Sequence, residues 1–431
     1  MTTRLQRSEI LRGMAVDAEN PLPPLADAGQ GRRGVSLPYR SRDSFGGSRG
    51  AYSLPALVLE NDCLRVSVLP TLGGRIDSLY DKGNRRELVH GDGGVEWSLG
   101  DGGFPAAAVV PMYAAEIDGP DGSPMLRLWE WERTRDLACQ VDLWLPEESS
   151  LLLVGVRVHN PHDHPVPVDW CSNLVVPPGA RLLGPGAGRW TAAVYADGAG
   201  LVRLSTPSPG ECVTAGGSWH RLEAFGPCYA GTAAHGDERG VVAGLERRLP
   251  DADMLGRLRR AWLGAADARP RTMLSHGLGW GALETHRMLI ELPATPYPAE
   301  SMGAEQLPWL ALLDGAPLTG DPAADPGPTL VNAYWRELLE YAPPTWKTWY
   351  HRGVARWVAG DRQEAADAWA MSLAHEENAW ALRGLAVVSR LSGDLDRAVR
   401  RYARAVELAP GVRPLAAEAA EARLAARTPP R

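Results

Sequence analysis

Hydrophobic and polar residues alternate along most of the chain between residues 51 and 292. Every second residue in 139–145 and in 152–158 is apolar, so these side chains would share one face of a strand. An Asn61-Asp62 turn separates two further stretches of this kind. Short alternating strands separated by turn residues predict antiparallel sheets that pack face to face. We therefore expect a mainly β domain, and the sequence lacks the β-α-β rhythm of a parallel sheet.

The period changes to 3.6 residues near the C-terminus, which predicts helices. A Gly-Asp turn begins at Gly360 and recurs 33 residues later at Gly393, and Trp369 recurs as Tyr402. This pattern resembles the tetratricopeptide (TPR) repeat, a helix–turn–helix unit of about 34 residues. Residues 414–427 would then form the capping helix.

Two TPR-like repeats are fewer than the roughly three that usually bury their own core. We therefore expect the helices to pack against the β domain or against a second subunit. A helical buttress is favoured over a peptide-binding groove because the repeats are so few. Binding of a protein partner, or self-association, through these helices remains the alternative.

A length of 431 residues favours two folded units. Residues 1–50 are rich in Pro, Gly and Arg and predict a partly ordered, extended arm with one possible strand at 35–39. We assign 51–292 to an antiparallel β-supersandwich, 293–341 to a Pro/Gly-rich connector and 342–431 to TPR-like helical repeats.

Charge and cysteine content narrow the functional classes. The net charge is −7 and no long basic run is present, so neither nucleic acid nor a membrane is an expected partner. No apolar stretch suits a signal peptide, and five cysteines without a C-x-x-C pair predict reduced thiols in a cytoplasmic protein. The histidines of 159–164 lie in a Pro-bounded turn, so we expect neither a metal site nor a cofactor.

Tryptophan is unusually frequent, with 16 Trp against 3 Phe. In "LRLWEWERTR", residues 126–135, Trp129 and Trp131 would point one way with the arginines, and Glu130 and Glu132 the other way with the leucines. Indoles beside polar groups are typical of carbohydrate sites. Alternatively the tryptophans fill the sandwich and the glutamates are solvated. A third possibility is that the two glutamates form a glycosidase pair.

Three other segments repeat this combination of Trp with acidic or amide residues and Gly. They are Glu96 with Trp97, then Asp169 with Trp170 and Asn173, and finally His276 with Trp280 and Glu284. A hydrophobic core does not require acidic residues beside Trp so often. The repetition therefore favours a carbohydrate-type pocket over packing alone.

The motifs "VLPTLGGRIDSLYDK", "GGVEWSLG", "LRLWEWER", "WCSNLVVP" and "GLGWGALE", followed by the TPR units, resemble one bacterial family. It is a domain family of unknown function that joins a galactose-mutarotase-like β-supersandwich to TPR repeats. The resemblance covers nearly the whole chain and implies a fold shared with aldose 1-epimerases and with the sandwich domains of several glycosidases.

Aldose 1-epimerases use a Glu base and a His acid, and the resemblance implies Glu284 and His276, on a late strand, for these roles. Glu96 is a second carboxylate candidate, and Arg75 a residue that would bind sugar hydroxyls. The chain departs from the family in a short loop around residues 91–92 and in the absence of histidines after "GGVEW". These departures affect a catalytic role more than a binding role.

Three hypotheses follow from these patterns. The first is acid–base chemistry on a sugar, epimerase-like or hydrolytic, with Glu96, Glu284 and His276 as catalytic residues. The second is sugar binding without chemistry, and the third is a TPR scaffold for a protein partner with a structural β-sandwich. The expected substrate-binding residues of the first two are Arg75, Trp97, Trp129, Trp131, Arg133, Trp170, Asn173 and Trp280.

Overall fold

The protein is described here by a computed structural model that covers residues 2–16, 20–23, 25, 45–89, 94–99, 110–176, 178–184, 189–207, 210–230, 238–247, 249 and 252–427. The chain divides into two compact units. The β unit comprises Met1–Met14 and Arg49–Ser301, and the helical unit comprises Ala15–Ser48 and Met302–Arg431. The possible strand at 35–39 lies outside the described residues.

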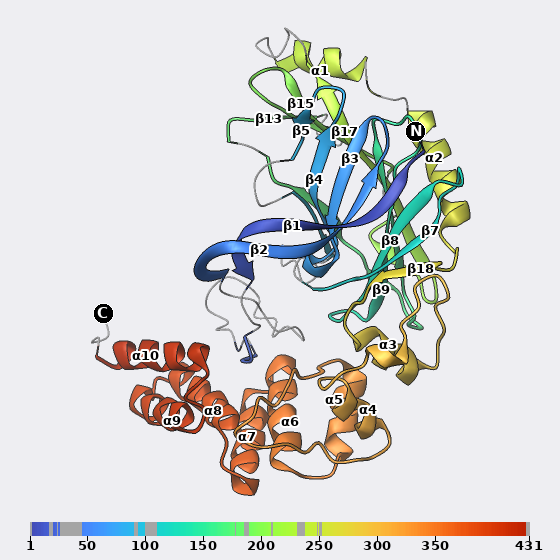
Figure 1. The fold of residues 1–431 in the computed structure, drawn as a ribbon. Helices are drawn as coiled ribbons and strands as arrows, with labels where there is room; N and C mark the ends of the chain where they lie inside the picture. The colour runs from blue at the N-terminus through green and yellow to red at the C-terminus, as the bar shows by residue number, and fades with distance from the viewer. Residues whose placement is uncertain are drawn as a thin grey trace. The chain divides into compact units, whose positions relative to one another are not determined.

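Two antiparallel sheets form the β unit (Figure 1). The seven-stranded sheet has the order β1-β2-β3-β4-β6-β12, with β5 paired to β4. Its strands are β1 (Arg4–Val16), β2 (Phe45–Glu60), β3 (Leu64–Leu69), β4 (Arg75–Asp81), β5 (Arg86–Glu87), β6 (Val95–Leu99) and β12 (Trp170–Leu174). The predicted turn at Asn61 is confirmed, since its side chain accepts hydrogen bonds from the backbone N–H groups of Cys63 and Leu64.

The second sheet has nine strands in the order β13-β14-β15-β17-β10-β9-β8-β7-β18. They are β7 (Tyr113–Asp118), β8 (Pro124–Glu132), β9 (Leu137–Trp144), β10 (Leu152–His159), β13 (Arg181–Leu183), β14 (Trp190–Val194), β15 (Ala199–Ser205), β17 (Ser218–Tyr229) and β18 (Thr272–Ser275). The short strands β11 (Val166–Pro167) and β16 (Cys212–Val213) pair with each other.

The main hydrophobic core contains side chains from both sheets, which therefore pack face to face as the alternation predicted. From the nine-stranded sheet it includes every second residue of β10, such as Val154 and Val156, and from the seven-stranded sheet Val66 and Val68. Burial of these apolar side chains is the main stabilising term for such a sandwich.

The expectation that β structure continues to residue 292 is wrong. After β17 the chain forms α1 (Glu238–Glu246) and α2 (Ala252–Ala265), and after the short β18 it forms α3 (Trp280–Met288). Trp262 of α2 packs in a second hydrophobic cluster with Leu153 and Leu222 of the nine-stranded sheet. Both faces of this sheet are thus apolar in part, and α1 and α2 cover the face turned away from the main core.

The helical unit contains α4 (Leu307–Leu313), α5 (Ala333–Tyr341), α6 (Trp346–Ala359), α7 (Arg362–His375), α8 (Ala379–Leu391), α9 (Leu395–Leu408) and α10 (Arg413–Arg427). Two helix–turn–helix pairs, α6/α7 and α8/α9, followed by α10, confirm the TPR-like prediction. Gly360 and Gly393 end the first helix of each pair at positive φ angles of 92° and 81°. Helices α4 and α5 lie in the segment expected to be a connector. Within the described residues, no helix is long and apolar enough to cross a membrane.

Candidate functional site

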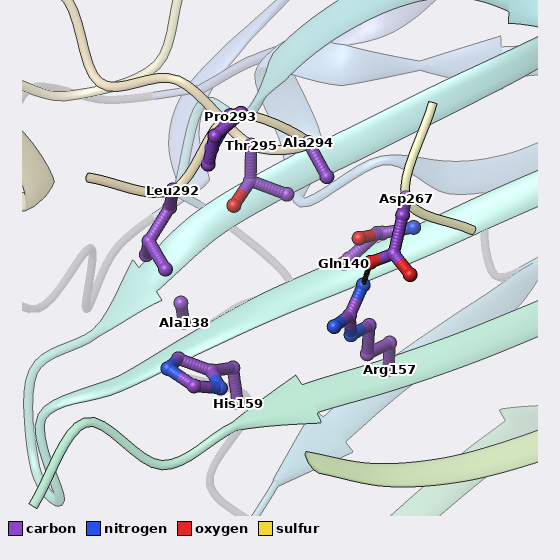
Figure 2. Close-up of a pocket in the computed structure, with 9 residues that line it drawn as sticks. All are labelled: Ala138, Gln140, Arg157, His159, Asp267, Leu292, Pro293, Ala294 and Thr295. Atoms are coloured by element: carbon purple, nitrogen blue, oxygen red, sulfur yellow. Dashed lines mark hydrogen bonds and ion pairs between the residues drawn. The ribbon is translucent and has the colours of Figure 1, made fainter. Parts of the chain in front are cut away.

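A cavity of about 200 Å³ lies on the face of the nine-stranded sheet turned away from the main core (Figure 2). Its walls are Ala138, Gln140, Arg157, His159, Asp267, Leu292, Pro293, Ala294 and Thr295. Arg157 forms an ion pair with Asp267, and Gln140 donates hydrogen bonds to Asp142 Oδ2 and to a backbone carbonyl. Burial lowers the pKa of His159, whose Nδ1 lies 3.2 Å from the Ser218 hydroxyl. Most polar groups of this cavity thus have partners within the protein.

A second cavity of about 360 Å³ lies between β1, β2 and β18. Its walls are Arg7, Ser8, Glu9, Pro55, Ala56, Leu57, Pro70, Leu274 and Ser275. The exposed His276 follows the last of these residues in the chain. Of the residues that were predicted to form the site, His276 is the one closest in sequence to a residue that lines a cavity.

The polar residues expected from the sequence meet instead on the outer face of the seven-stranded sheet. Arg75, Glu96 and Asn173 come from the adjacent strands β4, β6 and β12. Asn173 pairs with Glu96 in the sheet register, so their side chains share a face. The neighbouring Ile76 and Val95 point into the main core, which places Arg75 and Glu96 on the opposite face.

Arg75 lies between two carboxylates in this group. Its Nη1 is 3.1 Å from Glu96 Oε1, and its Nη2 is 3.8 Å from Asp77 Oδ1. The side chains of Arg75, Glu96 and Asp77 are 13%, 25% and 6% exposed, so a ligand can reach part of the group. Asn173 Nδ2 lies 3.5 Å from the Ser98 hydroxyl. We call these five residues the outer-face cluster.

Asp77 was missed by the sequence reasoning. It lies where the register between β3 and β4 shifts, since Ser67 pairs with Ser78 but Val68 pairs with Ile76. Asp77 is two residues from Arg75 in the same strand, so alternation places both side chains on one face. The motif "GGRID" offered only a weak signal, an acidic residue at position i+2 from an arginine.

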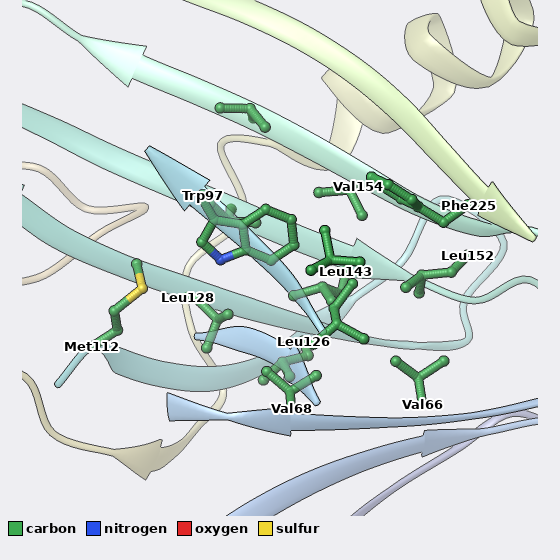
Figure 3. Packing of buried hydrophobic residues seen from close by; sticks show 14 of the residues in the cluster. Val66, Val68, Trp97, Met112, Leu126, Leu128, Leu143, Leu152, Val154 and Phe225 are labelled. Atoms are coloured by element: carbon green, nitrogen blue, oxygen red, sulfur yellow. The ribbon is translucent and has the colours of Figure 1, made fainter. Parts of the chain in front are cut away.

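Trp97 and Trp170, both expected to bind substrate, belong to the main hydrophobic core rather than to the outer-face cluster. Figure 3 shows Trp97 among the core side chains. Their rings stack at 6.2 Å between centroids with an interplanar angle of 21°. Trp97 Nε1 donates to the Gly74 carbonyl and Trp170 Nε1 to the Ser172 hydroxyl. These indoles pack in the main core and hold the strands that carry Glu96 and Asn173.

Trp129 and Trp131 are fully buried, so they are not available as substrate-binding surfaces. They do not fill the sandwich either, because Leu126 and Leu128 on the opposite face of the strand lie in the core between the sheets, and Trp129 belongs to a separate cluster. Trp129 stacks on Tyr113 at 5.5 Å, and the Trp131 ring meets Tyr297 edge to face at 5.9 Å. Their indole N–H groups donate to the Pro296 carbonyl and to an Asp136 carboxylate oxygen. Neither ring offers an open face for a sugar.

Glu130 and Glu132 are buried, at 7% and 9% exposure, which contradicts the expectation of solvated glutamates. Glu130 accepts hydrogen bonds from the backbone N–H groups of Trp131 and Leu278, and Glu132 from those of Thr134 and Arg135. Burial raises the pKa of Glu130 to about 8 and also raises that of Glu132. Both carboxyl groups hold backbone turns in place.

Glu284 lies in helix α3, so its assignment to a late strand is wrong. It is 2% exposed, and Arg287 Nε donates to its Oε2 at 2.6 Å. Trp280 is buried at the start of the same helix, and the Arg133 guanidinium lies 4.2 Å from its ring centroid. The three predicted catalytic residues thus belong to β6, to the loop after β18 and to α3. Within the described residues, no group of three or more His, Cys, Asp or Glu could hold a metal ion.

No family model matches the chain. Its structure is similar to that of a TPR-domain containing protein from Parabacteroides distasonis ATCC 8503, with a TM-score of 0.59, 15% sequence identity and coverage of 99% of this chain and 84% of that one. This likeness shows that the two chains share a fold. A protein from Escherichia coli K12 provisionally described as an aldose 1-epimerase matches 40% of this chain and 98% of its own, with a TM-score of 0.32 and 10% identity.

Proposed function

We propose that the protein binds a carbohydrate on the outer face of its seven-stranded sheet, at the outer-face cluster. The observation that carries this proposal is the partly exposed Arg75 guanidinium, 3.1 Å from Glu96 and 3.8 Å from Asp77. A sugar hydroxyl both donates and accepts hydrogen bonds. The two carboxylates supply acceptors, and Arg75 with the Asn173 amide supplies donors.

The charge of the cluster supports a neutral ligand. One guanidinium stands against two carboxylates, so the ionised cluster carries a net charge of about −1. Phosphates and other anions would meet repulsion at such a site, whereas a polyol would not. The rigid strands and the Trp97–Trp170 stack beneath them keep the polar groups in fixed positions, which lowers the entropy cost of binding.

Acid–base chemistry on the bound sugar is the second candidate, and the accessibility of Glu96 favours it. A general base must reach the proton that it removes, and Glu96 is the most exposed carboxylate of the cluster. His276 follows β18 of the nine-stranded sheet rather than a strand of the cluster, so it has no part in this second candidate. Glu284 is left out of this proposal because it is buried and paired with Arg287.

Calorimetric titration with neutral monosaccharides and short glycans tests the proposal. A sugar that binds the wild type should bind Arg75→Ala and Glu96→Gln at least about tenfold more weakly. Arg65→Ala and Glu60→Gln are the matched controls, since Glu60 pairs with Arg65 on the same sheet. Failure of the whole panel to bind folded protein, or equal losses in the controls, would contradict the proposal.

The same variants separate binding from chemistry. Turnover of the sugar by the wild type that is lost in Glu96→Gln, even at sugar concentrations that saturate the variant, would favour the enzyme. Binding without turnover in the wild type would favour a sugar-binding protein. An anomerisation assay by NMR on the sugar found by titration gives this readout directly.

A further inference from the structure

The helical unit holds a distant segment of its own chain. Leu22 and Leu25, from "NPLPPL", residues 20–25, are 2% and 5% exposed and belong to the hydrophobic core of the TPR-like helices. The Asn20 side chain accepts a hydrogen bond from the Leu22 N–H at 3.0 Å, which fixes the start of the segment. The segment is more than 300 residues away from α8 in the sequence, and a hydrogen bond joins residue 23 to residue 383.

A buried arginine contacts the backbone of this segment. Arg383 of α8 has a side chain only 6% exposed, and its Nη1 donates to the Pro23 carbonyl at 2.7 Å. Its Nε and Nη2 donate to the two carboxylate oxygens of Glu418 on α10, at 2.9 and 2.7 Å. Glu418 therefore fixes the guanidinium plane with two hydrogen bonds and leaves Nη1 for the carbonyl.

The segment has the properties of a peptide ligand. Proline-rich chain favours an extended conformation without internal hydrogen bonds, so it loses little entropy on docking and presents its carbonyl groups. Such peptides are commonly recognised through apolar side chains that enter the binding face and through hydrogen bonds to their backbone. Leu22 and Leu25 supply the apolar side chains here, and the carbonyl that accepts the hydrogen bond lies between them. Packing of the two leucines alone would not require the nearly buried Arg383 to be held by Glu418, which is 28% exposed, with one guanidinium nitrogen directed at the carbonyl.

We propose that the face of α8 and α10 around Arg383 and Glu418 is a binding site for short leucine–proline peptides, and that residues 20–25 of the same chain are its resident ligand. A ligand that belongs to the same chain has an effective concentration of roughly millimolar, so it competes with free peptides for the site. A partner protein that carries a similar Pro-Leu-Pro-Pro-Leu segment is the kind of molecule that would compete for this face.

Fluorescence anisotropy with a labelled synthetic peptide of residues 19–26 tests this proposal on the full-length protein. The peptide should bind Leu22→Ser/Leu25→Ser at least about tenfold more tightly than the wild type, because the resident segment is weakened and the face is kept. Adding Arg383→Lys should remove most of this binding, since Lys cannot contact Glu418 and the carbonyl in the same way. A peptide with serine at both leucine positions should not bind.

Arg401→Lys in the Leu22→Ser/Leu25→Ser background is the matched control. Arg401 also donates to a backbone carbonyl of the helical unit, that of Leu385 at 2.9 Å, so its replacement should leave peptide binding unchanged. Circular dichroism checks that each variant keeps its helices. If the double variant unfolds, Leu22→Ser alone replaces it in the binding measurement. Equal peptide affinity for wild type and a folded Leu22→Ser/Leu25→Ser, or no affinity for either, would overturn the proposal. A wild-type dimer that this variant makes monomeric would also overturn it, because the segment would then come from a second copy.

Discussion

Protonation of the buried Glu130 should make the stability of the β unit depend on pH. Burial raises the pKa of this carboxyl group from 4.5 to about 8, and the hydrogen bonds from Trp131 and Leu278 and the charge of Arg133 offset the shift only in part. Its side chain faces the loop after β18, and the space around it is so tight that a Cβ added at Gly277 would lie 2.2 Å from Glu130 Oε2. Water therefore has little room to solvate the carboxylate.

The sign and size of the effect follow from proton linkage. Between pH 4.5 and about 8 the folded protein holds a proton on Glu130 that the unfolded chain has lost. The free energy of unfolding therefore falls as the pH rises through this window, and the contribution is fully present below pH 4.5. Each pKa unit corresponds to about 1.4 kcal/mol, so the total loss approaches 5 kcal/mol.

Glu130→Gln should abolish this pH dependence. The amide resembles the protonated acid, but it can accept a hydrogen bond from only one of the two N–H groups. The variant should thus be less stable than wild type by about 1–2 kcal/mol at pH 5, because one buried donor loses its partner. It should be more stable at pH 8, and the two stability curves should cross near pH 6, by rough calculation from the same linkage relation.

Urea unfolding at several pH values, followed by tryptophan fluorescence, measures these curves. Hydrogen exchange in β8 assigns the transition to the β unit, since the two units can unfold separately. Glu60→Gln is the control for the replacement of a glutamate by its amide, because Glu60 is partly exposed and pairs with Lys82. A stability difference between wild type and Glu130→Gln that stays constant from pH 5 to pH 8 would refute the reasoning.

Three further predictions concern the stability of the folded protein. Arg127→Met should lower the free energy of unfolding, measured in urea, by about 3–5 kcal/mol, because it leaves the fully buried Asp142 without its positively charged partner. Much of this loss should return in Arg127→Met/Asp142→Leu, and a loss below about 1 kcal/mol would contradict the reasoning. Gly155→Ala should cost about 1–3 kcal/mol in thermal unfolding, because its Cβ would lie 2.1 Å from Trp262, and an unchanged Tm would argue against that contact. Asn378→Ala should destabilise the helices by about 1 kcal/mol or more in far-UV circular dichroism melts, because Asn378 caps α8, and equal melting curves would count against the cap.

The direction of each side chain in the tryptophan–glutamate strand could be read from the sequence. Alternation predicted that Leu126 and Leu128 share one face and Trp129 and Trp131 the other, and the leucines lie in the main core. Burial of Glu130 was not predictable, because it depends on a backbone N–H from residue 278, which is distant in sequence. Local patterns contain no information on which distant donor satisfies a buried acceptor.

The outer-face cluster shows the same limit for function. Arg75, Glu96 and Asn173 were each selected from the sequence, but their meeting depends on the strand order β4-β6-β12. Strands β6 and β12 are neighbours although five strands separate them in the chain order. Glu284 was also selected, and a helix buries it against Arg287.

The sequence by itself determined the periodic features: antiparallel sandwich strands, the turn at Asn61 and the TPR-like repeats. These features follow from side-chain spacing and turn residues, which act over a few neighbouring positions. Only the tertiary structure decided that Trp129 and Trp131 are fully buried, that Glu96 pairs with Asn173, and that Leu22 and Leu25 pack on the helices. Each of these outcomes depends on which distant surfaces exclude water together, and no local period specifies that choice.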